Sequence, residues 1–267
     1  RTLRSYIEQP LNDYDEIIRR HKAIEEINRQ MITREELREY LNPIYDLERI
    51  MTKVIYQTAN PRDLLAFKTP SAMLPPIKSL LADYRGDLLR QICEDLDPLE
   101  DLHALIDASI SEDPPISVRD GDIIKDGYSE DIDHYRDAKT KGKQWLADLE
   151  IKEREKTGIK NLKVKYNKVF GYYLEVTNSY KDLVPDYFIR KQTLANAERY
   201  FTPELKELED TILGAEDKLT TLEYEYFREI REHIASQIER IQKTAKAVAN
   251  LDVFLSQVDL VIVMVGH

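Results

Sequence analysis

The residues best suited to chemistry in this sequence are lysines and arginines gathered in one stretch. The segment "LKVKYNKVFGYYLEV" at 162–176 alternates apolar with polar residues, and its lysines outnumber its acids. Residues 160–203 hold eight Lys or Arg and four Asp or Glu, a net charge of +4 in a chain whose net charge is −11. A chain this acidic does not attract phosphate or anionic membranes in general, so any contact with nucleic acid must come from a local basic patch. The pattern predicts anion binding at this stretch.

Other chemistries find little support. The sequence has no "GxxxxGK[ST]" phosphate loop, no "HExxH" motif and no grouping of a nucleophile with a base. The four histidines of the chain's interior, His21, His103, His134 and His233, do not have metal-ligand spacing. We therefore expect no catalytic, cofactor or metal site in this chain, and no enzyme activity.

The single cysteine, Cys93, excludes an internal disulfide and favours a reducing cytoplasm. The first residues lack the pattern of a signal peptide, and no uninterrupted apolar run reaches the roughly 20 residues of a membrane span. We expect a soluble protein with no membrane contact.

Composition and periodicity predict a mainly α protein. Hydrophobic residues make up 42% of the chain and charged residues 33%, with 8 Gly and 11 Pro. Residues 1–128 are predicted to form a helical core, with helical spacing over 12–41 in two pieces, the second from Thr33. Further helices are predicted at 44–57, 61–67 and 77–96, with "TPSAMLPP" as a break and "SEDPPISVRDGDIIKDGY" as an irregular or hairpin connection.

Two later segments have the three- and four-residue apolar spacing of a coiled-coil seam. One follows Ser129 and includes Trp145. The other follows Thr202, a predicted N-cap, and continues without a break to about residue 265. We expect residues 129–158 and 203–265 to form an antiparallel pair of long lever helices. Residues 159–202 would then be a small β insertion at its tip, with four antiparallel strands.

The sequence resembles the core, lever and clamp region of the MutS family of DNA mismatch-repair proteins. The resemblance is carried in order by "RSYIEQPL", "DLERI", "ANPRDL", "VRDGDIIKDGYSEDID", "NKVFGYYLEV" and "RKQTLANAERYFTPELKELED". It implies that this chain lacks the mismatch-reading, connector and ATPase domains, and that ATP and Mg bind only in the full-length protein. It also implies a bacterial, cytoplasmic protein that associates with the nucleoid when on DNA, forms a homodimer and acts with repair partner proteins.

The resemblance further implies that the clamp grips the backbone of duplex DNA without reading sequence. Phosphate partners would be Lys168, Arg190, Lys191 and Arg199; neutral donors would be Asn167, Gln192, Thr193 and Asn196. Gly171 would allow close approach of the backbone. Ala195 stands where many members carry Lys, which removes one phosphate contact. Lys163 and Lys165 share a strand face, and whether that face meets DNA stays open.

Two plainer interpretations accompany these. Lysines on an alternating strand more often belong to a solvated face, and the tyrosines at 172, 173, 187 and 200 suit the core of a small sheet better than stacking on bases. The alternative function is a coiled-coil module for protein docking that binds no DNA of its own. Salt separates the two functions, because phosphate binding weakens steeply with salt and apolar docking does not.

Overall fold

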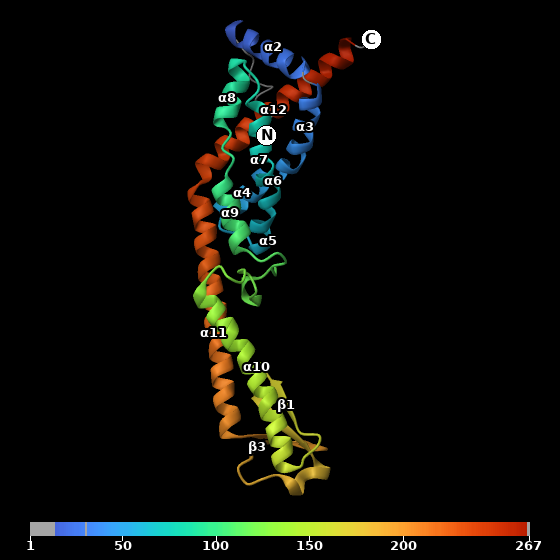
Figure 1. Cartoon of the computed structure of the whole chain (residues 1–267), viewed down its shortest axis with the longest axis vertical. Helices are drawn as coiled ribbons and strands as arrows, with labels where there is room; N and C mark the ends of the chain where they lie inside the picture. The colour runs from blue at the N-terminus through green and yellow to red at the C-terminus, as the bar shows by residue number, and fades with distance from the viewer. Residues whose placement is uncertain (1–13, 30, 266–267) are drawn as a thin grey trace. The chain divides into compact units, whose positions relative to one another are not determined.

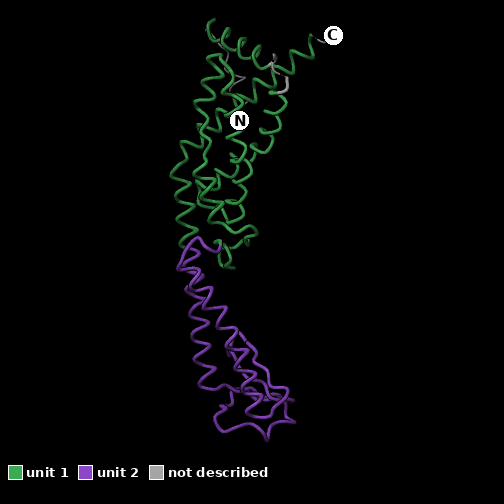
Figure 2. Tube along the Cα trace, viewed as in Figure 1, with its two compact units in different colours: residues 1–125, 225–267 green, residues 126–224 purple. Residues whose placement is uncertain are grey.

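The structure is a computed structural model that describes residues 14–29 and 31–265; the side chains of residues 28–32 lie outside this description. The "RSYIEQPL" motif at 4–11 also lies outside it. Within the described ranges the chain is mainly helical and falls into two compact units, residues 1–125 with 225–267 and residues 126–224 (Figure 2). The predicted fold class, mainly α with a long antiparallel helix pair that carries a small antiparallel sheet, is confirmed (Figure 1).

The first unit is a bundle of short helices around one long helix. Its helices are α2 (Tyr14–Arg29), α3 (Met31–Leu41), α4 (Leu47–Ile55), α5 (Pro61–Ala66), α6 (Lys68–Ala72), α7 (Leu74–Leu81), α8 (Asp87–Asp95), α9 (Glu100–Ser109) and α12 (Ile238–Val265), with 3-10 turns η1 (Asn42–Asp46) and η2 (Val118–Asp120). Helix α12 packs against α2, α3, α4 and α8 and buries Leu251, Phe254 and Val258. The C-terminal helix is therefore part of this unit's core.

Several helix boundaries differ from the sequence-based expectation. The segment expected to be one helix at 77–96 is two, because the chain turns at 82–86 before α8 begins at Asp87. "TPSAMLPP" is mostly helical: Pro75 and Pro76 occupy the first turn of α7, where a missing N–H costs nothing. The "SEDPPISVRDGDIIKDGY" connection forms an isolated bridge, Ile110↔Ile124, with Gly121 and Asp122 at positive φ.

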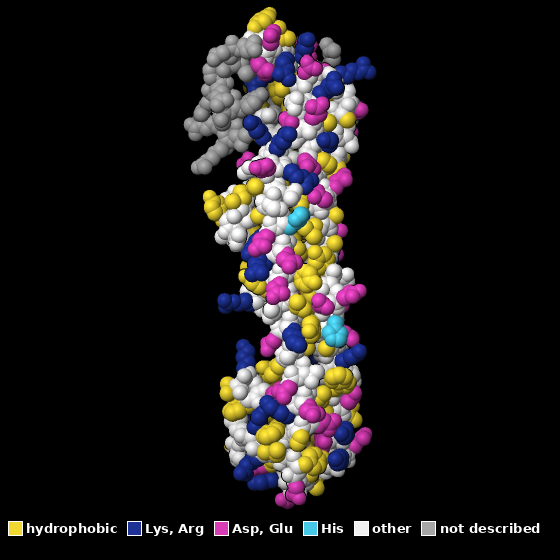
Figure 3. Space-filling model, turned by 90° about the vertical axis from the view of Figure 1, so that its left-hand side faces the viewer, with side chains coloured by type: hydrophobic (Ala, Val, Ile, Leu, Met, Phe, Trp, Pro, Cys, Tyr) yellow, Lys and Arg dark blue, Asp and Glu magenta, His cyan; other side chains and the backbone are white. Residues whose placement is uncertain are grey.

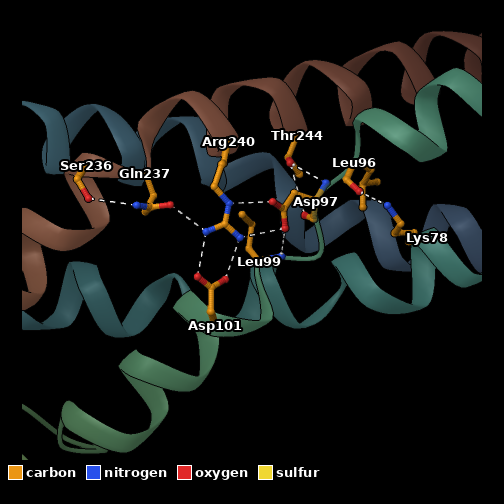
Figure 4. Close-up of polar contacts among 9 residues, drawn as sticks. All are labelled: Lys78, Leu96, Asp97, Leu99, Asp101, Ser236, Gln237, Arg240 and Thr244. Atoms are coloured by element: carbon orange, nitrogen blue, oxygen red, sulfur yellow. Dashed lines mark hydrogen bonds and ion pairs between the residues drawn. The ribbon is translucent and has the colours of Figure 1, made fainter.

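Arg240 of α12 is the centre of an ion-pair group in the first unit (Figure 4). Its guanidinium donates to Asp97 in the α8–α9 connection and to Asp101 in the first turn of α9, with shortest N–O distances of 2.8 Å and 2.9 Å. The backbone N–H of Asp97 donates to Thr244 Oγ1 at 3.0 Å, and Lys78 Nζ donates to Leu96 O at 2.7 Å. These contacts fix α12 against the connection that leads into α9.

By length and composition, α12 is the one helix in the described ranges that is long and apolar enough to cross a membrane. The sequence-based expectation of no membrane span considered only uninterrupted apolar runs. Helix α12 meets the length and mean-hydropathy criteria for a span although polar residues interrupt its apolar run. In its most apolar stretch, 33% of the residues are buried inside the structure, and core helices of soluble proteins have the same composition. The finding is weak evidence for a span.

The second unit consists of a sheet and two antiparallel helical segments, residues 130–157 and 203–224. Helix α10 (Glu130–Thr157) is capped by Ser129, whose Oγ accepts the N–H of Ile132, and ends at Gly158, which has φ 75°. Helix α11 (Pro203–Ser236) is capped by Thr202, whose Oγ1 accepts the N–H of Leu205 at 3.1 Å. Ion pairs Arg136–Glu223, at 2.5 Å, and Lys152–Glu204, at 2.9 Å, run in opposite order along the two helices and establish the antiparallel arrangement.

The buried seam of α10 is shifted from the one read off the sequence. Trp145 was expected to pack between the helices but is 44% exposed, and Leu146 is buried in its place. The long helix expected at 203–265 is also interrupted, at Gln237, so α11 and α12 are separate helices. Ser236 Oγ donates to His233 O at 2.5 Å there, and such bonds from a serine back to the preceding turn compete with the regular ladder and bend helices.

Four antiparallel strands lie between α10 and α11 in the sequence, as predicted. They are β1 (Lys163–Asn167), β2 (Gly171–Thr177), β3 (Ile189–Thr193) and β4 (Ala197–Phe201), in the order β1-β2-β4-β3, with a 3-10 turn, η3 (Asn178–Leu183), after β2. The β3–β4 register shifts between Arg190 and Gln192, which makes Lys191 a bulge.

Candidate nucleic-acid interface

One face of the sheet packs on the helices and the other does not. Leu174, Val176 and Tyr200 share a buried cluster with Leu149 of α10 and Ile212 of α11. Successive strand residues point to opposite faces, and the register pairs Lys163 and Arg199 with Glu175 and pairs Lys165 with Tyr173. The outer face therefore carries Lys163, Lys165, Tyr173, Glu175 and Arg199.

Charged side chains form a row across this outer face. Lys165 Nζ donates to Glu175 Oε2 at 2.5 Å, and Arg199 Nε lies 3.7 Å from Glu175 Oε1. Arg199 Nη1 donates to Gln192 Oε1 at 3.0 Å, and its Cζ lies 4.5 Å from the ring centroid of Tyr173. The hydrogen bond from Lys165 holds the pKa of Glu175 below its ordinary value, against partial burial that would raise it. One carboxylate thus orients two cations, and the row keeps a net positive charge.

Lys191 lies at the bulge of β3, and its side chain contacts other groups of the protein. Its ammonium donates to the carbonyl oxygen of Phe170, and its Nζ lies 5.5 Å from the ring centroid of Phe201. This predicted phosphate partner is therefore held against the turn that joins β1 to β2.

The turn at 168–170 and the residues on either side of it include three further members of the predicted site, Asn167, Lys168 and Gly171. Asn167 Oδ1 accepts the N–H groups of Val169, at 2.8 Å, and Phe170, at 3.3 Å, so its oxygen closes the turn and its amide N–H groups remain as donors. Lys168 is exposed on this turn, and Gly171 follows it with φ 77°. In the structure the group beside Gly171 is the carboxylate of Glu209 on α11, and the close approach of DNA at Gly171 stays a prediction.

The hairpin that joins β3 to β4 lies at the opposite end of the sheet. Asn178 holds it: its N–H donates to Asn196 O and its Nδ2 to Ala195 O, both at 3.0 Å. Thr193 and Asn196 are exposed there. Seven residues of β2 separate this hairpin from the 168–170 turn, a span of roughly 20 Å.

Arg190 belongs to a different group of charges. The register pairs it with Tyr200, on the face opposite Arg199, and its Nη1 lies 3.8 Å from Glu198 Oε1. Lys181 of η3 approaches the same carboxylate at 3.5 Å. The hydroxyl of Tyr200 donates to Glu198 and lowers its pKa, whereas burial and Glu198 raise the pKa of Tyr200 to about 12.

The structure thus divides the predicted site residues into three groups. Lys191, Gln192 and Arg199 lie together near the outer face, and Lys191 connects them to Asn167, Lys168 and Gly171. Thr193 and Asn196 lie at the far hairpin, and Arg190 pairs with Glu198. Sequence reasoning left Lys165 open and did not consider Lys181. The alternation of residues predicted that Lys163 and Lys165 share one face of the sheet. That Glu175 lies beside them could be known only from the strand register.

The tyrosines are mostly structural, as expected. Tyr173 and Tyr200 are buried, and Tyr172 packs against the buried cluster. Tyr187 is more exposed, yet its hydroxyl donates to Glu153 Oε2 at 2.5 Å.

Figure 3 shows basic side chains at the sheet end of the second unit interspersed with acidic and hydrophobic ones. Within residues 14–29 and 31–265, no group of three or more His, Cys, Asp or Glu side chains is placed to hold a metal ion. The chemistry that this surface offers is contact with anions through lysine, arginine and amide donors.

Comparison with known proteins agrees with this division of the chain. The model for MutS family domain IV matches residues 127–218, close to the limits of the second unit at 126–224. DNA mismatch repair protein MutS of Lachnoclostridium phytofermentans is 64% identical over 256 residues, and those of Caldanaerobacter subterraneus subsp. tengcongensis and Acetivibrio thermocellus are 55% and 52% identical.

Each of these alignments covers 96% of this chain, which spans 28–30% of the length of those curated relatives. With the matched domain model in the second unit and these identities along nearly the whole sequence, the chain belongs to the MutS family, and residues 127–218 are its domain IV.

Proposed function

We propose that the sheet end of the second unit binds the backbone of duplex DNA without reading base sequence. The observation that carries this proposal is the row of cations on the uncovered face, Lys163, Lys165 and Arg199, with Lys191 beside it. Lysine, arginine and amide donors on phosphates fix the position of a protein on the duplex but carry no sequence information. A span of roughly 20 Å between the two turns of the sheet corresponds to about six base steps.

The proposal extends to the whole protein through the relatives, which are named DNA mismatch repair protein MutS. In that setting the chain acts in a cytoplasmic dimer together with repair partner proteins, and ATP and Mg bind in a separate ATPase domain. The sequence here contains no phosphate loop, so we propose no ATP hydrolysis by this chain. The antiparallel pair α10 and α11 would transmit the conformational state of the rest of the protein to the sheet.

Fluorescence anisotropy with a short homoduplex tests the binding proposal. We expect weak binding whose affinity falls steeply with salt, because each phosphate contact contributes about 0.9 to the slope of log K against log salt. Lys191→Ala/Arg199→Ala should weaken binding and reduce this slope by about 2. Lys143→Ala, an exposed lysine on α10, is the matched control and should leave the slope unchanged.

The sequence of the duplex should not matter to affinity. Binding that is insensitive to salt, or equal loss in the double variant and in Lys143→Ala, would contradict the proposal. If the chain associates with protein but not with DNA at any salt concentration, the coiled-coil docking function is favoured instead.

A further inference from the structure

The first residues of β2 extend beyond the strand that should pair with them. The β2–β4 ladder begins at Leu174↔Tyr200, so β4 offers no partner to the backbone N–H of Tyr172. A buried amide without an acceptor is costly. Helix α11 supplies the acceptor, because Glu209 Oε1 accepts this N–H at 2.7 Å. A side chain 37 positions along the chain thus completes the strand.

The residue before Tyr172 makes room for this contact. A Cβ on Gly171 would lie 1.6 Å from Glu209 Oε1, and Gly171 also has φ 77°, a conformation that side-chain-bearing residues rarely adopt. A side chain at position 171 would be disfavoured by the backbone conformation, and it would displace the Glu209 carboxylate from its contact with Tyr172.

Two lysines surround the same carboxylate. Glu209 is 4% exposed, and Lys206 Nζ donates to its Oε2 at 2.9 Å. Burial raises the pKa of Glu209, but the hydrogen bonds from Lys206 and Tyr172 and the charges of Lys206 and Lys191 outweigh it and leave the pKa below its ordinary value. The ammonium of Lys191 donates to the carbonyl of Phe170, one residue before Gly171. Two hydrogen bonds therefore fix the end of the turn: Glu209 of α11 accepts the N–H of Tyr172, and Lys191 donates to the carbonyl oxygen of Phe170.

We propose that Glu209 is a positioning residue for duplex binding: it fixes the 168–170 turn and, through the Phe170 carbonyl, directs the Lys191 ammonium toward that turn. This inference rests on the proposed function. It makes the buried carboxylate a contributor to DNA affinity although its charge repels phosphate.

The sign of the effect on affinity tests the inference. Removal of an acidic charge beside a phosphate-binding surface should by electrostatics alone raise affinity, and Glu207→Ala, an exposed acid on the same helix, is the control for that effect. Positioning predicts the opposite for Glu209→Ala, a loss of about three- to tenfold in anisotropy titrations at low salt. Glu209→Gln retains an acceptor for Tyr172 and should bind better than Glu209→Ala.

A double-mutant cycle isolates the route through Lys191. If Glu209 acts by orienting Lys191, then Lys191→Ala added to Glu209→Ala should cost less than Lys191→Ala in the wild type. Hydrogen exchange supplies a readout without DNA: the Tyr172 amide should lose protection in Glu209→Ala and keep it in Glu209→Gln.

Each failure has its own meaning. Wild-type binding with unchanged or raised affinity in Glu209→Ala, or additive losses in the cycle, overturns the positioning role and leaves the proposed function intact. If the wild type shows no salt-sensitive binding at all, the proposed function is overturned, and the role of Glu209 in binding with it.

Discussion

The carboxylate of Glu153 is 2% exposed, and the hydroxyl of Tyr187 reaches it from the segment before β3. Glu198, Glu209 and Glu223 are likewise buried in the second unit, and each accepts a donor from a side chain or backbone group. A buried carboxylate that loses its donor retains the full desolvation penalty. These residues are therefore points at which single substitutions should have clear effects.

Tyr187→Phe removes the donor to Glu153 and leaves the ring in place. We expect a loss of about 1–3 kcal/mol in the free energy of unfolding, because Glu153 becomes a buried acceptor without its partner. Urea denaturation followed by circular dichroism measures the loss. Tyr166→Phe, which removes a hydroxyl from a half-exposed ring, is the control and should change stability by less than about 0.5 kcal/mol.

The pH dependence of the same contact has a defined sign. Burial and the hydrogen bond to Glu153 raise the pKa of Tyr187 to about 12. Because the folded-state pKa lies above the unfolded one, this contribution to stability is complete below pH 10 and is lost as pH rises through about 12. The stability of Tyr187→Phe should therefore fall less than that of the wild type over this range.

At this scale the sequence predicted residue types better than partners. It predicted close approach of DNA at Gly171, which stays a prediction, and nothing in the local sequence indicates that Glu209, 38 positions later, lies against this glycine. It placed Lys163 and Lys165 on one face, but the sharing of Glu175 by Lys165 and Arg199 depends on the register of three strands. Contacts between residues distant in sequence are set by tertiary packing, which periodicity alone does not specify.

The two glycines of the long helices differ in what surrounds them. A Cβ on Gly142 of α10 would lie 2.4 Å from Ile212 Cγ1 on α11, whereas a Cβ on Gly214 of α11 would meet nothing within 4 Å. Gly142 is therefore a point of close contact between the helices, and Gly214 is a weakness in a helix interior.

Gly142→Ala and Gly214→Ala should change stability in opposite directions. Alanine favours a helix over glycine by about 1 kcal/mol, so Gly214→Ala should stabilise the protein by roughly that amount. At Gly142 the overlap with the β-branched Ile212 should outweigh the gain and cost about 1–3 kcal/mol. Midpoints of thermal unfolding for the two variants test this contrast, and a gain in both would show that α10 and α11 separate easily.

Elements were predicted best where periodicity and caps agreed. Ser129 and Thr202 start α10 and α11 as expected, and strand alternation gave the four strands. Trp145 is exposed because the buried seam of α10 passes through Leu146 instead. Both positions fit the three- and four-residue steps between Gly142 and Leu149, so spacing alone could not choose between them. The interruption at Gln237 has no Gly or Pro to mark it.

At the scale of the whole molecule, charge is distributed unevenly along the chain. The +4 segment at 160–203 lies in the second unit, and the rest of the chain carries about −15. In the first unit, Arg240 stabilises the charged forms of two aspartates. Its hydrogen bonds keep the pKa values of Asp97 and Asp101 below their ordinary values.

This ion-pair group should make the first unit sensitive to acid. A carboxylate whose folded-state pKa is lowered contributes stability that is present above its unfolded pKa and is lost as pH falls through the folded value. We expect the free energy of unfolding to fall as pH drops below about 4, and to fall less in Arg240→Gln.

Urea denaturation at several pH values between 7 and 3 measures this difference. Lys246→Gln removes the same charge from the same helix at an exposed position and should follow the wild-type curve. If Arg240→Gln also follows the wild-type curve, the two aspartates do not depend on Arg240.

The division of the chain into units could be predicted only in part. The sequence pattern changes at Ser129, and the second unit begins at residue 126. Residues 225–267 belong to the first unit, and the sequence did not predict this. The apolar stripe continues through α11 into α12, and a stripe alone does not show which helices pack against it. Helix α12 packs on α8 and α2, not on a second long helix.

The strand order β1-β2-β4-β3 leaves β1 and β3 as the two edges of the sheet. Open edges can pair with strands of other molecules and begin aggregation, and lysines and bulges are common means of preventing it. Lys163 and Lys165 lie on one edge strand, and Lys191 forms the bulge of the other. The cations proposed to hold DNA therefore also disfavour pairing of these edges with strands of other molecules, so their removal should lower solubility as well as affinity.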